Sequence, residues 1–402
     1  MFHSFSLPLS LLPSFIVTDP CLTVKIEYDL SPFGLVTNHI VPGYIALKKL
    51  NAPSAVLQSF IENYSTCHKL TPRTLIPAHN RISDDNFAKH LGDFGYYPDY
   101  QIFFSKKLLS VGSSSSSVIE TTYKAFMPRL VGGFAGAAFH GVISAYFAYE
   151  LQHIDACVDG LAYLAATHVP LPDLSQFSDH NPSAEHARDS ISILQACEEL
   201  RSDAKMRSTY AGLFAAAGCS PTSFQDRLNM VVLAPDNAAL LAPYFRRLGG
   251  FSRQFTMAQM KKFACGLYAA SSNDFFLLHT CTTLWCLDQV FTGRLVADKR
   301  AQDALIQSYL FVLLSVYVAQ EFPSLSSPSP SPSSAAAWND VVHRAINFQA
   351  RNPAADEHIP KLVFVAKQFF DDDCDDVFFA AAANVVGRSS SSSSKSNDES
   401  KL

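Results

Sequence analysis

Apolar residues recur along this chain at the three- and four-residue spacing of amphipathic helices, and alternating runs are few. Residues 53–64 show the pattern well, because Pro53 stands in the first turn and apolar side chains follow at helical spacing. The same spacing predicts further helices over residues 98–111, 132–150, 153–168, 183–200, 254–271, 274–291, 298–320, 338–349 and 360–370. Only residues 22–28 alternate as a short strand would. The pattern therefore predicts an all-α fold.

Serine-rich segments interrupt this pattern and suggest where the chain leaves its core. Residues 113–117 and the Pro-Ser run at 323–334 have no composition for packing, so we predict two surface-loop insertions. The second is not a domain boundary, because residues 338–386 are too short to fold alone. The predicted organisation is an extended N-terminal arm at 1–30, a single multi-helix domain at 31–386 and a disordered tail at 387–402.

Composition narrows the class of protein. The chain has 402 residues, of which 48% are hydrophobic, so a large core is available. Its 31 basic residues are scattered and its net charge is -5, which argues against a nucleic-acid partner. No run reaches the ~18 uninterrupted apolar residues of a membrane span. The nine cysteines lack a Cys-x-x-Cys pair, so we expect reduced, buried thiols in an intracellular protein.

The chain finishes in Ser400-Lys401-Leu402, the tripeptide that the peroxisomal import receptor reads. The serine-rich residues before it cannot form a core and should present the tripeptide to a receptor. We therefore expect a peroxisomal protein with the import receptor as a partner.

Two conspicuous runs are better explained by structure than by chemistry. The glycine-rich run at 131–138 lacks the Gly-x-Gly-x-x-Gly spacing of a dinucleotide site, and small residues that let two helices approach closely explain it better. The acidic run Asp371–Asp376 lacks the glycine and spacing of a calcium loop, so we predict a solvated loop between two helices. Neither an esterase-type nor a P-loop motif is present.

Four histidines stand in apolar, helix-like segments, namely His39, His140, His279 and His358. Any one of them is consistent with a core histidine whose nitrogens bond to the backbone. Burying four unpaired imidazoles would be costly, and a shared metal would remove that cost. Neutral imidazole binds Fe, Zn, Cu or Ni well. Both interpretations follow from the residues alone.

Lys361 lies three residues after His358, so the two share one face of a helix. Pro360 fits only in a first turn, which places Asp356 near the N-cap and the candidate site at a helix start. Glu150 and Glu357 could each orient a histidine or lie at the surface, so neither receives a role.

These residues resemble the questin oxidase-like family, which is known from fungal aromatic polyketide pathways. The resemblance runs from about residue 33 to 370. It is carried by Asn38-His39, by Ala46–Ala52, by Leu91-Gly92 before Phe103-Phe104, by Ala138–Ile143, by Leu278–Thr282 and by Asp356–Lys361.

The resemblance implies oxidation of anthraquinone-type substrates, by Baeyer-Villiger-like or dioxygenase ring cleavage. It also implies a non-haem Fe(II) centre that uses O₂, with His39, His140, His279 and His358 as ligands and Lys361 as a carboxylated fifth ligand. Pro42 and Ser144 stand where many fungal members carry extra histidines, so the substrate pocket should differ. The many phenylalanines and tyrosines could line such a pocket.

Three other functions fit parts of the sequence. An NADPH-dependent monooxygenase without a metal is one, although no nucleotide fingerprint supports it. A non-catalytic helical ligand-binding protein is another. A zinc hydrolase is the third, although catalytic zinc usually takes three protein ligands and water.

Overall fold

The computed structural model describes residues 39–67, 79–109, 115–174, 191–217, 224–248, 256–326, 334–352 and 356–391. These residues form sixteen α-helices and four short 3₁₀ helices, with no strand among them, so the all-α prediction is confirmed. The predicted N-terminal arm, the predicted strand at 22–28 and the tripeptide Ser400-Lys401-Leu402 lie outside the described residues.

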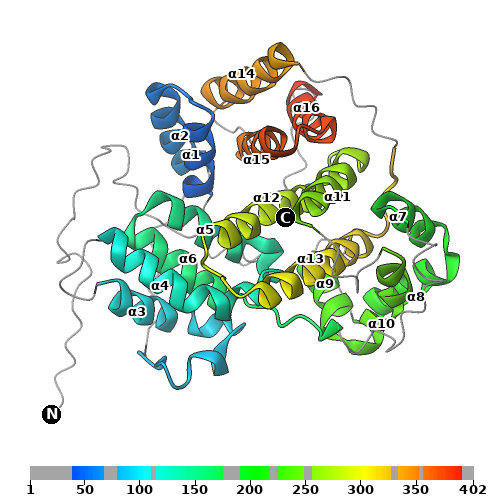
Figure 1. Cartoon of the computed structure of the whole chain (residues 1–402), viewed down its shortest axis with the longest axis horizontal. Helices are drawn as coiled ribbons and strands as arrows, with labels where there is room; N and C mark the ends of the chain where they lie inside the picture. The colour runs from blue at the N-terminus through cyan, green and yellow to red at the C-terminus, as the bar shows by residue number, and fades with distance from the viewer. Residues whose placement is uncertain are drawn as a thin grey trace.

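Three helices cross the middle of the molecule, and the others surround them in three groups (Figure 1). The central helices are α11 (Met257–Ala270), α12 (Phe275–Thr292) and α13 (Lys299–Ala319). The first outer group is α3 (Tyr97–Leu108), α4 (Ser115–Leu130), α5 (His140–Leu151) and α6 (Ile154–Ala166). The second is α7 (Ile193–Ser202), α8 (Ala204–Ala216), α9 (Phe224–Leu233) and α10 (Pro235–Arg247). The third is α1 (Ile40–Lys49), α2 (Ser54–Cys67), α14 (Ala335–Arg351), α15 (His358–Asp373) and α16 (Asp376–Ser391).

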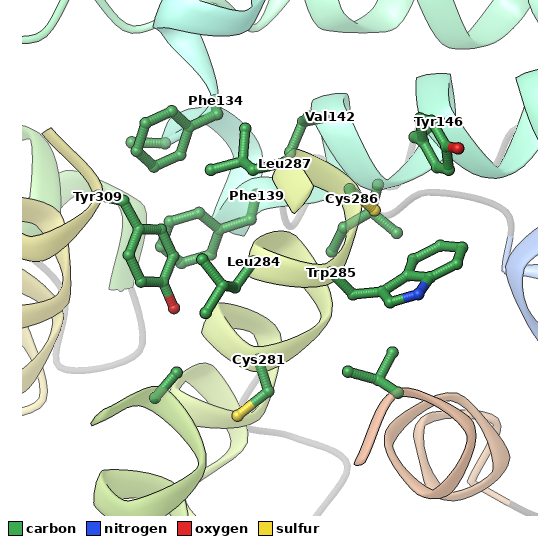
Figure 2. Packing of buried hydrophobic residues seen from close by; sticks show 14 of the residues in the cluster. Phe134, Phe139, Val142, Tyr146, Cys281, Leu284, Trp285, Cys286, Leu287 and Tyr309 are labelled. Atoms are coloured by element: carbon green, nitrogen blue, oxygen red, sulfur yellow. The ribbon is translucent and has the colours of Figure 1, made fainter. Parts of the chain in front are cut away.

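Helix α12 is buried along almost its whole length and organises the core. Asp274 caps its start by accepting hydrogen bonds from the backbone N–H groups of Phe276 and Leu277. Figure 2 shows Trp285 on one side of this helix and the Phe139 and Tyr309 rings on the other. Because α12 packs against α5, α11, α13 and α15, side chains along it can meet several segments that are distant in sequence.

Helix α13 is long and apolar enough to cross a membrane by length and composition, the one such helix in the described part of the chain. However, 61% of its apolar window is buried inside the fold. It packs against α9, α10, α11 and α12, so its apolar surface is that of a core helix.

Glycines outside the predicted 131–138 run bring α5 and α6 into close contact. A Cβ on Gly160 of α6 would lie 2.7 Å from the Cα of Ala145 on α5. A Cβ on Gly141 of α5 would lie 2.8 Å from the Oγ1 of Thr167. Such distances leave no room for a side chain, so the close approach depends on glycine.

The helix predicted over 132–150 is wrong at its beginning, since α5 starts only at His140. Short 3₁₀ turns at Val131–Gly133 and Gly136–Phe139 precede it. Ala137, Ala138 and Phe139 all have left-handed backbones, with φ of 48°, 50° and 73°. For residues other than glycine this conformation costs ~1–2 kcal/mol each, so other contacts must hold the turn.

The predicted acidic loop does lie between two helices, but it is shorter than the acidic run, which also includes two helix ends. Helix α15 continues to Asp373 and α16 begins at Asp376. Lys261 contacts Asp372 at 2.9 Å, and Lys262 contacts Asp375 at 2.8 Å. The run therefore ties α11 to the turn between α15 and α16.

Other boundaries differ as well. Helix α4 begins at Ser115, inside the predicted 113–117 loop, and α16 ends at Ser391, inside the predicted tail. The described part of the 323–334 segment has no helix before α14. Five free thiols are buried and a sixth, that of Cys374, is exposed; the buried ones are Cys157, Cys197, Cys265, Cys281 and Cys286.

Candidate metal centre

The four histidines predicted from the sequence come from four helices that pack together. His39 is the N-cap of α1, while His140 and His358 are the first residues of α5 and α15. His279 lies in the second turn of α12. Helix α1 contacts α5 and α15, and α12 contacts the same two helices, so the four side chains meet in the interior.

The four imidazoles form a closed ring in which each packs against two others. The ring centroids of His39 and His140 are 4.8 Å apart, and those of His140 and His279 are 4.7 Å apart. His358 closes the ring, with its centroid 4.8 Å from His279 and 4.7 Å from His39. All four residues are at least nine-tenths buried.

Lys361 and Glu357 contact this ring at His39. The Nζ of Lys361 lies 3.1 Å from His39 Nδ1, and Glu357 Oε1 lies 2.5 Å from the same nitrogen. Lys361 is 2% exposed and lies one turn after His358 on α15, on the face that the sequence predicted. The structure thus brings all five predicted residues together.

Hydrogen bonds at the Nδ1 atoms fix how three of the imidazoles face the centre. His140 Nδ1 donates to the carbonyl of Ala137 at 2.7 Å, and His279 Nδ1 donates to the carbonyl of Phe275 at 2.8 Å. His358 Nδ1 lies 2.8 Å from the carboxylate of Asp356. Because these oxygens only accept, each neutral ring carries its proton on Nδ1 and has a lone pair on Nε2.

Those Nε2 lone pairs fit a bound cation. The Nε2 atoms of His140 and His279 are 3.2 Å apart with no proton to share between the neutral rings. His358 Nε2 is buried and has no hydrogen-bond partner among the described residues. Two imidazole nitrogens bound at right angles, roughly 2.1 Å from one metal ion, lie about 3 Å apart. A divalent metal would satisfy these nitrogens, whereas apolar packing would leave them unpaired.

Protonation is disfavoured at the same atoms. Burial lowers the pKa of His140 to about 4, and the positive charge of Lys361 adds to the effect. Burial also lowers the pKa values of His279 and His358 well below their usual range. Neutral imidazole is the form that binds metals, so the protein holds these rings ready for a metal.

Lys361 is poised to lose its proton. Burial lowers its pKa to about 8, against the opposing charges of Glu357 and Asp356. An appreciable fraction of this amine is therefore neutral near neutral pH, unlike that of a surface lysine.

Neighbouring residues shield and orient the ring. The Phe275 ring packs 4.6 Å from His279 and 4.7 Å from His358, which excludes water from that side. Tyr64 accepts a hydrogen bond from the backbone N–H of His39 at 3.0 Å. Burial raises the pKa of the Tyr64 hydroxyl, so this group stays protonated.

The two glutamates left open by the sequence have different positions. Glu357 contacts His39 directly, whereas Glu150 contacts Tyr146 and Lys49. Tyr64 and Phe275 could not be predicted from the sequence, because their contacts with the histidines depend on tertiary packing.

Fold and centre together define an all-helical protein with a buried histidine–lysine site suited to a metal ion. The family model described as questin oxidase-like matches residues 36–365, which include all five of these residues. The chain therefore belongs to the questin oxidase-like family. Membership indicates an oxidoreductase that acts on anthraquinone-type substrates. No curated protein sequence matches the chain.

Proposed function

We propose that this protein is a non-haem Fe(II) oxygenase that uses O₂ to cleave oxidatively a ring of an anthraquinone-type polyketide. The observation that carries the proposal is the closed ring of four buried imidazoles, three of which burial keeps neutral, beside a buried lysine. Bound Fe(II) would supply the one-electron chemistry that O₂ requires.

The histidines would hold the metal through nitrogens that the fold keeps unprotonated. For His140, His279 and His358 that nitrogen is Nε2, because Nδ1 is already bonded to oxygen. Metal-bound histidines commonly donate their other ring nitrogen to a carboxylate or a carbonyl, and both kinds of partner are present here.

Lys361 would become an anionic ligand by reacting with carbon dioxide. The neutral Nζ attacks the carbon of CO₂, an N–C bond forms and one proton leaves to solvent, which gives a carbamate with one negative charge. The lowered pKa of Lys361, about 8, favours the neutral amine that this reaction needs. Four neutral imidazoles and one carbamate would leave the metal with net positive charge and room for O₂ or an ionised phenol.

Metal analysis of anaerobically purified protein tests the proposal, with the His140→Ala variant beside the wild type. We expect near-stoichiometric iron in the wild type and its loss in the variant, because His140 supplies a ligand nitrogen. His343→Ala is the matched control, since His343 is exposed on α14 and should leave iron content unchanged. Oxygen-dependent turnover of an anthraquinone should likewise be present in the wild type and in His343→Ala and lost in His140→Ala.

Other outcomes would contradict the proposal in distinguishable ways. Stoichiometric zinc with no oxygen uptake would favour a hydrolase. Turnover that requires NADPH and persists in metal-free protein would favour a monooxygenase without a metal. Iron that remains in His140→Ala would remove that residue from the ligand set.

We further propose import into peroxisomes through Ser400-Lys401-Leu402. A fluorescent protein fused before residue 1 should appear in peroxisomes, and deletion of Leu402 should leave it in the cytosol. Equal distribution of both fusions would contradict this proposal.

A further inference from the structure

The strained turn before His140 is held by a side chain from another helix. Gln225 of α9 accepts a hydrogen bond from the backbone N–H of Ala138 at 2.6 Å through its Oε1. Its Nε2 donates to the Ala135 carbonyl at 3.3 Å and to Asn229 Oδ1 at 2.7 Å. One amide thus bonds to both sides of a turn in which three successive residues have left-handed backbones.

The same turn supplies the hydrogen-bond partner of His140. The carbonyl of Ala137 accepts from His140 Nδ1 at 2.7 Å. That carbonyl and the N–H of Ala138 belong to one planar peptide group, so they move as a rigid unit. Gln225 therefore holds one edge of a peptide plane whose other edge orients the imidazole.

The N-terminal end of α9 packs against α12, the helix that carries His279. Phe224, the residue before Gln225, stacks on Phe276 of α12 with ring centroids 3.8 Å apart and an interplanar angle of 11°. His279 lies three residues after Phe276 on α12, and its Nε2 lies 3.2 Å from the Nε2 of His140. Helix α9 thus contacts both the turn that precedes His140 and the helix that carries His279.

We propose that Gln225 is a positioning residue that fixes the orientation and tautomer of His140 through the Ala137–Ala138 peptide. Without Gln225 this peptide can rotate out of its strained conformation, and His140 Nδ1 loses its acceptor. The ring is then free to carry its proton on Nε2, which removes the lone pair aimed at the centre. The inference rests on the proposed metal centre, although the tautomer of His140 can be measured without any metal.

Two readouts on the Gln225→Leu variant test this role. Long-range ¹H–¹⁵N NMR of metal-free, histidine-labelled protein reports the His140 tautomer, with His140→Gln to assign the signal. We expect a single Nδ1–H tautomer in the wild type and a mixture in Gln225→Leu. Titration with Co(II) should show affinity lower by about tenfold or more, as for other groups that orient a ligand.

Matched variants separate positioning from general packing. Gln302→Leu also removes a partly buried glutamine that bonds a backbone carbonyl, but on α13, and should change neither readout. Gln225→Glu keeps an acceptor for the Ala138 N–H and should keep the wild-type tautomer. Adding Ala138→Gly to Gln225→Leu should restore both readouts, because glycine adopts the left-handed conformation without strain.

A wild-type tautomer and wild-type Co(II) affinity in folded Gln225→Leu would overturn the inference. If Gln225→Leu does not fold, Gln225→Ala takes its place, and a wild-type tautomer and affinity in that folded variant would overturn the inference in the same way. Failure of the wild type to bind Co(II) would count against the metal centre alone. The tautomer comparison would then still decide the role of Gln225.

Discussion

His140 shows how burial can set the charge of a residue in the centre. Its ordinary pKa of 6.5 falls to about 4, chiefly through burial and then through the charge of Lys361. The Ala137 carbonyl opposes this shift by accepting the Nδ1 proton, but it does not reverse it. The His140 imidazole is therefore neutral near neutral pH.

This shift predicts how the metal-free protein responds to acid. Between about pH 4 and pH 6.5 the unfolded chain binds a proton at His140 that the folded chain does not. Stability should therefore fall as pH drops through this window, by up to about 1.4 kcal/mol per pH unit for each such group. Urea unfolding of wild type and His140→Gln from pH 4 to pH 7 measures it. Equal slopes for the two proteins would contradict the prediction.

A second prediction at this scale concerns Glu357. Its carboxylate contacts His39 Nδ1, so Glu357→Gln should weaken metal binding by about 10- to 100-fold while the protein stays folded. Glu150→Gln is the matched control, because Glu150 contacts Tyr146 and Lys49 and no histidine of the ring. Co(II) titration of both variants measures the effect, and equal affinities would refute it.

The four histidines of the ring and Lys361 were found from the sequence for two separate reasons. Their apolar surroundings marked the histidines as buried, and the resemblance grouped them with Lys361. Gln225 and Tyr64 could not be found in this way, because their contacts run to backbone groups of distant segments. Hydrogen bonds of that kind leave no periodic pattern in a sequence.

Among the helices, periodicity located the three central ones well and missed several outer ones, including α4 and α8. Helices α11, α12 and α13 begin and end within a few residues of their predicted bounds. Helix α8 was missed, since only Tyr210 and Phe214 are buried along its length. The start of α5 was misplaced because Ala137 and Ala138 favour helix by propensity, and the left-handed turn arises from tertiary contacts.

The close approach of α5 and α6 gives a prediction for these two helices. Gly160→Ala would place a Cβ 2.7 Å from the Cα of Ala145, so we expect a loss of about 1–3 kcal/mol in the free energy of unfolding. Gly212→Ala on α8 is the control, because a Cβ there meets nothing within 4 Å. It should instead stabilise the protein by roughly 0.5–1 kcal/mol. Thermal or urea unfolding compares the two, and a neutral Gly160→Ala would contradict the packing argument.

In the molecule as a whole, the centre joins segments from opposite ends of the described chain. His39 and Glu357 are separated by 318 positions, yet their side chains are in contact. A metal bound there would connect α1, α5, α12 and α15. The unfolded chain does not hold these residues together, so it would bind the metal far more weakly.

Metal binding should therefore stabilise the entire domain. Free Fe(II) at about 100 times its dissociation constant should add about 2.7 kcal/mol to the free energy of unfolding. Anaerobic thermal unfolding with and without Fe(II) measures this gain, and a chelator should reverse it. His140→Ala should show no gain, and an equal gain in that variant would place the metal elsewhere.

The separation of His39 from Lys361 by 322 positions also has a consequence for biosynthesis. At about 5–20 residues per second, a ribosome needs roughly 16 to 64 seconds to pass from one to the other. For most of that time α15 has not been synthesised, so helix α1 lacks its packing partner and the ring of imidazoles lacks His358. Under the proposed function, the full set of ligands therefore exists only after α15 has been synthesised, so iron and carbon dioxide would have to reach a protein that has already folded.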